Sequence, residues 1–213
     1  MEGPVPSRAR SLIARLIGRR PLARQAGRLY LALAGQARRP SFYLEGGVPD
    51  TVEGRYELLV LHAWLVIDRL AAAGGQGAAL AQALFDHMFA DIDRALRELG
   101  VGDLGVGRRV RRMAEGFYGR AAAYRAALAA GPDAADLELA LHRNLYGGAE
   151  PPEGALPAVA AYVFGAAAAL AAQPAAELMA GRLPVLAPAK VAASHEEDDG
   201  TRGIQPAFQP RKA

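Results

Sequence analysis

The chain has 213 residues, a formal net charge of +3 and no cysteine. The lack of cysteine excludes disulfides, thiolate metal sites and cysteine nucleophiles, and the length fits one domain with tails that can bury a real core. The sequence is rich in alanine and arginine, with 7% aromatic residues. We therefore predict an all-α protein, a single-domain multi-helix bundle built around a buried central helix.

Residues 1–39 form a basic arm with nine arginines and one acidic residue, Glu2. We predict disorder over residues 1–7, a short amphipathic helix over 8–18 and a second helix from Pro21, because proline suits a first helical turn. Two interpretations stay open: a docking helix pair with a solvated basic face, or an arm that contacts a membrane or the ribosome. The arginines of that contact would be Arg15, Arg19, Arg20, Arg24 and Arg28.

The α-helical domain is expected over residues 40–183, and its central helix follows a turn at Gly46, Gly47 and Pro49. We predict that Asp50 caps this helix and that Glu53 completes a capping box. Residues 58–67 are apolar nearly all round apart from His62. A helix without a wet face is normally buried, so this one should form the core and His62 should be a satisfied core residue.

The next helix is expected over about residues 78–99. Its apolar stripe consists of Ala81, Phe85, Met88, Ile92 and Leu96. Its polar side carries Asp86, His87 and Asp93, but the paired Glu-x-x-His motifs of di-iron bundles are absent. We therefore predict a solvated, partly ion-paired face and no metal site.

Residues 100–105, G-V-G-D-L-G, match the dinucleotide pattern G-x-G-x-x-G. That fingerprint must follow a strand, whereas this copy follows a helix. We predict a tight turn between helices, with Gly100 in the left-handed conformation and Asp103 capping the next helix.

A further helix is expected over about residues 104–130. Seven residues should face inward: Val106, Val110, Met113, Phe117, Ala121, Tyr124 and Leu128. The outward residues are Arg108, Arg109, Arg111, Arg112, Arg120 and Arg125, with Tyr118 beside them. This side is either a solvated basic face or a docking surface for a partner. Specific DNA binding is not expected, because no known motif is present.

The remaining chain contains a helix over about 133–146 and a long uncharged run over 155–172. The run nearly reaches the length of a membrane span, but its alanines, Pro157, Gly165 and missing basic flank favour a buried bundle helix. From Pro184 onward periodicity is lost, so residues 184–213 are predicted to be a low-complexity, disordered tail.

No catalytic motif is found. The sequence has no G-x-S-x-G, no Walker loop and no histidine pair at metal spacing, and its four histidines are scattered. We predict that the protein is not an enzyme, with no catalytic residues, metal ligands or cofactor.

Several ordered blocks resemble one family. They are Leu29-Tyr30, Ala37-Arg38, Phe42-Tyr43, G-V-P-D-T-x-x-G-R-Y-E-L-L from Gly47, His62, A-Q-A-L-F-D-H-M-F-A-D-I-D over 81–93, R-E-L-G-V-G-D-L over 97–104, Val106-Gly107 and F-Y-G-R over 117–120. Over residues 29–146 the chain is similar to the ubiquinol–cytochrome c chaperone family, assembly factors for the respiratory ubiquinol–cytochrome c reductase.

The resemblance implies a non-enzymatic assembly chaperone that binds newly made cytochrome b near the ribosome and the inner membrane. Mitochondrial members act with a small partner protein, and the need for one here stays open. The implied location is the cytoplasm or the inner-membrane surface, on the matrix side in a eukaryote. The alternative is a basic helical adaptor that binds membrane or ribosomal RNA without a dedicated client.

The matching blocks contain residues that a buried core does not require, and we take these as candidates for partner binding. They are Asp50, Thr51, Arg55, Asp86, Asp93, Asp103, Arg108, Arg112, Tyr118 and Arg120. Asp50 and Asp103 could instead serve only as helix caps, and Arg55 and Arg120 only as surface ion-pair partners. If this surface is not used, the apolar groove between the central helix and the next helix is the alternative site.

Overall fold

The computed structural model describes residues 7–131 and 135–186, with side chains from Pro21 onward except Leu104. Within these residues every regular element is a helix, which confirms the all-α prediction. The elements are α1 (Ser7–Ala37), α2 (Ser41–Leu44), α3 (Val52–Ala72), α4 (Gly75–Glu98), α5 (Asp103–Ala130), α6 (Ala135–Leu145), α7 (Ala155–Ala172) and α8 (Ala175–Met179).

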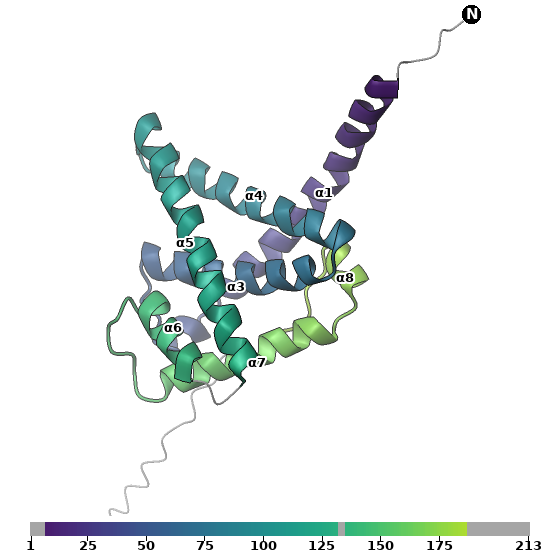
Figure 1. The fold of residues 1–213 in the computed structure, drawn as a ribbon. Helices are drawn as coiled ribbons and strands as arrows, with labels where there is room; N and C mark the ends of the chain where they lie inside the picture. The colour runs from purple at the N-terminus through teal and green to yellow at the C-terminus, as the bar shows by residue number, and fades with distance from the viewer. Residues whose placement is uncertain (1–6, 132–134, 187–213) are drawn as a thin grey trace, which may run out of the picture.

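The helix α3 is the centre of the bundle. It contacts α1, α4, α5, α6, α7 and α8, and Figure 1 shows it running through the middle, with α4 above, α7 below and α5 crossing in front. Leu58, Leu61 and Leu70 are fully buried, and Trp64 is nearly so. The apolar run of the sequence therefore forms the predicted buried core helix.

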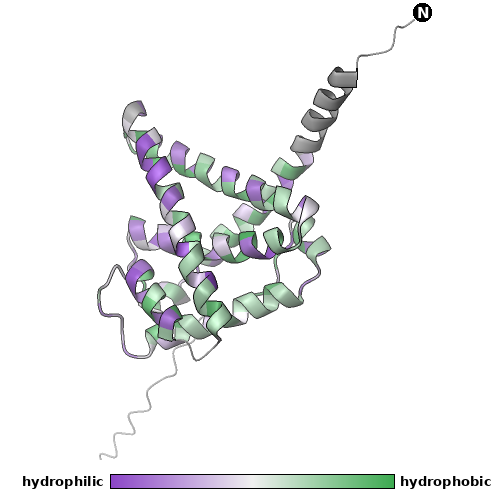
Figure 2. Cartoon of the chain, in the orientation of Figure 1, coloured by the Kyte–Doolittle hydropathy of each residue, from purple (hydrophilic) through white to green (hydrophobic). Residues whose placement is uncertain are grey.

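The helices α4 and α5 turn the predicted stripes toward the core, although Phe85 of α4 and Val110, Met113 and Leu128 of α5 are only partly buried. On α4, Leu84 and Met88 are fully buried and Ile92 and Leu96 nearly so. On α5, Val106, Phe117 and Tyr124 are buried, while the outer side stays hydrophilic, as the colouring of Figure 2 shows. Amphipathic helices of this kind pack their apolar stripe on the core and leave the opposite face wet.

The N-terminal segment corrects the prediction of two helices. A single helix, α1, runs through Pro21, so the expected break before this proline is wrong. Proline inside a helix removes one backbone hydrogen bond, and α1 tolerates it because its C-terminal half is anchored: Ala26 and Leu29 are fully buried and Leu33 nearly so. This half belongs to the bundle, whereas the predicted boundary at residue 39 assigned it to the arm.

The helix α7 packs on one side only. Val159, Val163 and Leu170 are buried against the bundle, where α7 contacts α3 and α6, and Arg69 of α3 donates to the Leu170 carbonyl at 3.0 Å. By length and composition alone, α7 is the one helix of the described chain that could span a membrane. Its contacts are those of the predicted bundle helix.

The packed chain continues slightly past the predicted boundary at residue 183. Leu186 is 5% exposed, and its carbonyl accepts hydrogen bonds from Gln36 and Arg39 of the α1 end at 3.5 and 3.0 Å. Leu186 therefore packs against the bundle, whereas Val185 is 91% exposed. The rest of the predicted tail, residues 187–213, and the predicted disorder over 1–6 lie outside the described residues, and Ser7 is helical.

A chain of neutral hydrogen bonds crosses the core. His62 Nδ1 lies 2.7 Å from the Leu58 carbonyl, so Nδ1 carries the proton and Nε2 accepts from the Tyr162 hydroxyl at 2.7 Å. The Tyr162 oxygen accepts in turn from Gln36 Nε2 at 3.2 Å. His62 is thus the satisfied core residue that was predicted. Burial lowers its pKa from 6.5 to about 4.

This shift predicts a loss of stability in mild acid. Below pH 6.5 the unfolded chain protonates His62, while the folded protein resists protonation until about pH 4, so the free energy of unfolding falls as pH decreases across this window. The contribution is on the order of 3 kcal/mol. Urea unfolding of the parent and of His62→Gln, whose amide cannot titrate, should converge from pH 6.5 to 4. Parallel curves would contradict this assignment.

Candidate partner-binding site

Two cavities flank the first two turns of α3. A polar pocket of about 370 Å³ is lined on this helix by Glu53, Gly54 and Glu57. An apolar groove of about 240 Å³ is lined by Val52, Arg55, Tyr56 and Leu59 of the same turns. One short stretch of helix is therefore the shared wall of two chemically different sites.

The start of α3 is fixed by Thr51, which corrects the prediction for Asp50. Thr51 has extended backbone angles, and its hydroxyl accepts a hydrogen bond from the Gly54 N–H at 3.1 Å. Asp50 instead accepts from Arg55 Nε at 2.6 Å, with both side chains more than half exposed. An exposed pair of this kind contributes at most about 1 kcal/mol.

Close backbone contacts hold the turn that precedes α3. A Cβ on Gly54 would lie 2.0 Å from the Pro49 carbonyl oxygen, and a Cβ on Gly47, where φ is +62°, would lie 2.2 Å from Pro152. The Tyr146 hydroxyl donates to the Gly46 carbonyl at 2.6 Å. These contacts explain the glycines of the G-V-P-D-T-x-x-G block and leave the wall between the cavities little freedom.

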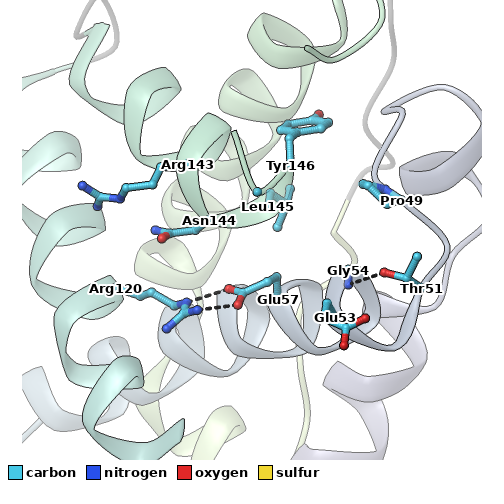
Figure 3. A pocket seen from close by; sticks show the side chains of 11 residues that line it. Pro49, Thr51, Glu53, Gly54, Glu57, Arg120, Arg143, Asn144, Leu145 and Tyr146 are labelled. Atoms are coloured by element: carbon cyan, nitrogen blue, oxygen red, sulfur yellow. Dashed lines mark hydrogen bonds and ion pairs between the residues drawn. The ribbon is translucent and has the colours of Figure 1, made fainter. Parts of the chain in front are cut away.

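The floor of the polar pocket is an ion pair between α3 and α5 (Figure 3). Arg120 donates from Nε and Nη2 to the two carboxylate oxygens of Glu57, at 2.6 and 2.5 Å. The side chains are 23% and 11% exposed, which makes this the least exposed ion pair of the described chain. Burial raises the pKa of Glu57, and the Arg120 guanidinium opposes that shift.

This contact corrects the placement of Arg120 on the outer basic face. The side chain turns back along α5, where Gly116 leaves it room: a Cβ on Gly116 would lie 2.6 Å from Arg120 Nη1. Sequence reasoning missed Glu57 altogether. The signal in the sequence was the position of this carboxylate, directly before the apolar run of α3. A carboxylate buried there needs a cation as its partner.

The apolar groove lies between α1, α3, α4 and α5, and thus includes the predicted alternative site between the central helix and its neighbour. Most of the remaining lining consists of Tyr30 and Ala34 of α1, Ile92 and Leu96 of α4, Leu99 directly after α4, and Met113 of α5. Val52 and Leu99 are 69% and 71% exposed. Large apolar side chains that remain exposed to solvent beside an apolar groove are typical of an interaction site.

The predicted acidic residues of α4 and α5 make local contacts. Asp86 accepts from Gln82 at 2.8 Å. Arg97 binds Asp93 at 2.6 Å and also pairs with Asp103 across the turn between the helices. Asp103 is not the predicted cap, because α5 starts after Gly102 without a side-chain cap. Across the described residues no cluster of histidine and carboxylate side chains suits a metal ion.

The turn over residues 100–105 joins two helices, as predicted. It lies between the end of α4 and the first turn of α5, and Gly100 has φ of +82°, the expected left-handed conformation. The match to the dinucleotide pattern therefore sits in a helix–helix corner, where no strand precedes it.

The outer face of α5 keeps its basic character without Arg120. Arg108 and Arg112 are exposed and form no ion pair with the described residues, whereas Arg111 pairs with Glu115. Tyr118 is 59% exposed, and its ring centroid lies 5.3 Å from that of Phe85. Arg24 and Arg28 of α1 are exposed as well, and the side chains of Arg15, Arg19 and Arg20 lie outside the described ones.

The structure therefore separates the predicted binding residues into three places. Thr51, Arg55 and Arg120 lie at the two cavities, with Asp50 paired to Arg55. Asp93 and Asp103 lie at the corner of α4 and α5. The others, Asp86, Arg108, Arg112 and Tyr118, are exposed along these helices.

Comparison with known proteins agrees with this architecture. The family model described as ubiquinol–cytochrome c chaperone matches residues 44–186. The chain belongs to this family. A crystal structure of the Cbp3 homolog from Brucella abortus is similar at 38% sequence identity and a TM-score of 0.72, over 84% of this chain and 99% of that one. No curated protein matches significantly.

Family membership confirms the predicted role in outline: this member of the ubiquinol–cytochrome c chaperone family is an assembly factor and not an enzyme. The matched region begins before the wall of α3 and ends at Leu186, so it contains the whole polar pocket and all of the groove lining except its residues on α1 and Arg38. The glycine-rich block at α3 and the F-Y-G-R block of α5, far apart in sequence, meet at the Glu57–Arg120 pair.

The different environments of the arginines lead to a stability prediction. Arg120→Ala should lower the free energy of unfolding by about 3 kcal/mol, because it leaves the Glu57 carboxylate buried without a partner. Arg108→Ala with Arg112→Ala should change it by less than about 0.5 kcal/mol, since both side chains are exposed. Thermal and urea unfolding measure both. Adding Glu57→Gln to Arg120→Ala should recover part of the loss, and equal stability of the two arginine variants would refute the structural role.

Proposed function

We propose that this chaperone binds newly made cytochrome b and promotes assembly of ubiquinol–cytochrome c reductase. The observation that carries the proposal is membership of the family over most of the chain. The bundle has a matching physical property, because its helices leave an apolar groove open beside a rigid wall. A client made of hydrophobic helices needs such a surface before it is inserted and folded.

The apolar groove is the proposed place for an apolar segment of the client. Val52 and Leu99 are wet in the free protein, so covering them would remove apolar surface from water at about 25 cal/mol per Å². The groove also has charged lining residues, Arg38, Arg55 and Asp91. These would remain at its edge and fix the orientation of a bound segment more than its affinity.

The basic face of α5 is proposed to contact an anionic surface near the site of synthesis, either ribosomal RNA or the inner membrane. Arg108 and Arg112 are exposed without ion pairs among the described residues. Unpaired surface arginines attract phosphate groups over a range set by the salt concentration. This contact would hold the chaperone at the cytoplasmic side of the inner membrane, or at the matrix side in a eukaryote.

Removal of the gene should abolish assembled ubiquinol–cytochrome c reductase while the other respiratory enzymes persist. Native gel electrophoresis with activity staining measures both. Crosslinking followed by mass spectrometry then separates the two candidate functions: captured cytochrome b supports the chaperone, whereas mixed RNA without a defined client supports the basic adaptor.

The two proposed surfaces can be tested separately in this capture assay. Val52→Asp with Leu99→Asp should reduce capture of cytochrome b several-fold, because charges on the groove must be desolvated on binding. Leu139→Asp, at an equally exposed leucine of α6, is the control and should have no effect. Unchanged capture by the groove variant would remove the groove from the mechanism.

The basic face should behave differently with salt. Arg108→Ala with Arg112→Ala should lower the affinity of capture at physiological salt and lower it further relative to the parent at low salt, where the lost charge contacts are screened least. Arg125→Ala with Arg182→Ala removes the same charge elsewhere and is the control, since these arginines already pair with Asp68 and Glu177. Parental capture by the first variant would exclude this face.

A further inference from the structure

The polar pocket beside α3 contains arginine N–H donors that the hydrogen bonds of the described residues leave unused. Arg120 uses Nε and Nη2 for Glu57, which leaves the two protons of Nη1. Arg143 lines the same pocket and makes no ion pair within the part of the chain that the structure describes. Each Glu57 oxygen, by contrast, already accepts a hydrogen bond from Arg120.

Buried polar atoms at the floor lack partners as well. Asn144 Nδ2 and the Tyr124 hydroxyl are buried and find no partner within hydrogen-bond limits among the described residues. The two side chains lie close together, since Asn144 acts on the Tyr124 hydroxyl and lowers its pKa against the effect of burial. A buried donor left without a partner costs about 1–3 kcal/mol, so a ligand that brings an acceptor gains this energy on binding.

The charges are distributed unevenly along the pocket. Figure 3 shows Arg143 and Asn144 at the Arg120 end of the ion pair, and Glu53 at the opposite end, beyond Glu57. The positive charges of Arg120 and Arg143 both oppose the rise that burial causes in the pKa of Tyr124. Unused donors and positive charge thus gather at one end, away from the free carboxylate of Glu53.

We propose that this end of the pocket binds a carboxylate, supplied by an acidic side chain of a polypeptide that docks on the chaperone. Arg143 and the free Arg120 Nη1 would donate to its oxygens, and Asn144 Nδ2 would obtain the partner it lacks. Guanidinium groups suit this ligand because their planar N–H groups match the two carboxylate oxygens. A lysine side chain would be repelled by the two arginines at this end, and the carboxylate of Glu53 lies at the other end.

The pocket lies on the opposite side of the α3 wall from the apolar groove. A client segment in the groove and an acidic side chain in the pocket would therefore contact the same two helical turns from different sides. The carboxylate site does not depend on the identity of the client, so it can be tested on the purified protein alone.

The test is an NMR titration of the full chain that follows the Asn144 side-chain amide and Arg120 Nε. The probes are acetate and a blocked tripeptide with a central glutamate, each against sodium chloride of equal ionic strength. We expect saturable shifts at both groups with both probes and none with chloride. The matching tripeptide with a central lysine should leave them unmoved.

Two variants make the result decisive. Arg143→Ala should weaken binding of the glutamate peptide about tenfold, the loss of one hydrogen-bonded charge, while Arg109→Ala, an exposed arginine of α5 outside the pocket, should leave it unchanged. Arg143→Lys should restore part of the affinity. Circular dichroism and the unfolding midpoint verify that each variant is folded.

Three results would overturn the proposal: no saturable shift with either probe, the same shifts with chloride, or equal weakening by Arg143→Ala and Arg109→Ala. Binding of acetate without the glutamate peptide would reject the polypeptide as the source of the carboxylate. If neither probe shifts the NMR signals while cytochrome b is still captured, the carboxylate site is rejected and the proposed function stands. If the probes bind but cytochrome b is not captured, the carboxylate site stands and cytochrome b is rejected as the client.

Discussion

The burial of α3 is the constraint on which the rest of the structure depends. Six helices contact it, and from Leu58 to Leu70 most of its side chains are buried. The polar side chains of such a helix can reach a ligand only where the neighbouring helices leave its surface uncovered. One such place is its first two turns, between Val52 and Leu59, where the polar pocket and the apolar groove open.

The core contains two sets of polar contacts, one neutral and one charged. The chain from His62 to Tyr162 and Gln36 is neutral and hydrogen-bonded at every step, so it can lie deep between α1, α3 and α7 at little cost. The Glu57–Arg120 pair carries charge, and complete burial of an ion pair costs more than its attraction returns. Its position at the floor of an open pocket, with Arg120 23% exposed, reduces that cost.

Much of the fold follows from the sequence because the helices α3, α4 and α5 each have one dominant pattern. The short all-round apolar run of α3 indicates a core helix, and the spacing of Met88, Ile92 and Leu96 admits one inward face. The ends of the helices were harder to predict. Asp50 and Thr51 are adjacent and both can cap a helix, and the choice was decided by Arg55, which engages the Asp50 carboxylate. The predicted helix start at Pro21 was wrong for a similar reason. The burial of α1 in the core outweighs the preference of proline for the first turn of a helix.

The candidate site was less predictable because its parts are far apart along the chain. Arg120 is one of six outward arginines expected on its helix, and nothing local distinguishes it from Arg108 or Arg112. Its role depends on Glu57, which is 63 positions away. What the sequence did contain were the glycines: Gly54 admits the Pro49 carbonyl and Gly116 admits the Arg120 guanidinium. A glycine inside a helix is costly, and each of these two marks a close approach at the pocket.

The geometry of the α3 wall also limits how the two cavities can work together. Thr51 caps its first turn, the Pro49 carbonyl fits against Gly54, and Glu57 is tied to α5. These contacts hold the wall from three directions, so a ligand on one side meets a surface that is already ordered. Binding to an ordered surface avoids part of the entropy cost of association. The groove and the pocket therefore keep a fixed spacing, and a polypeptide that reached both would have to match that spacing with its own apolar and acidic residues.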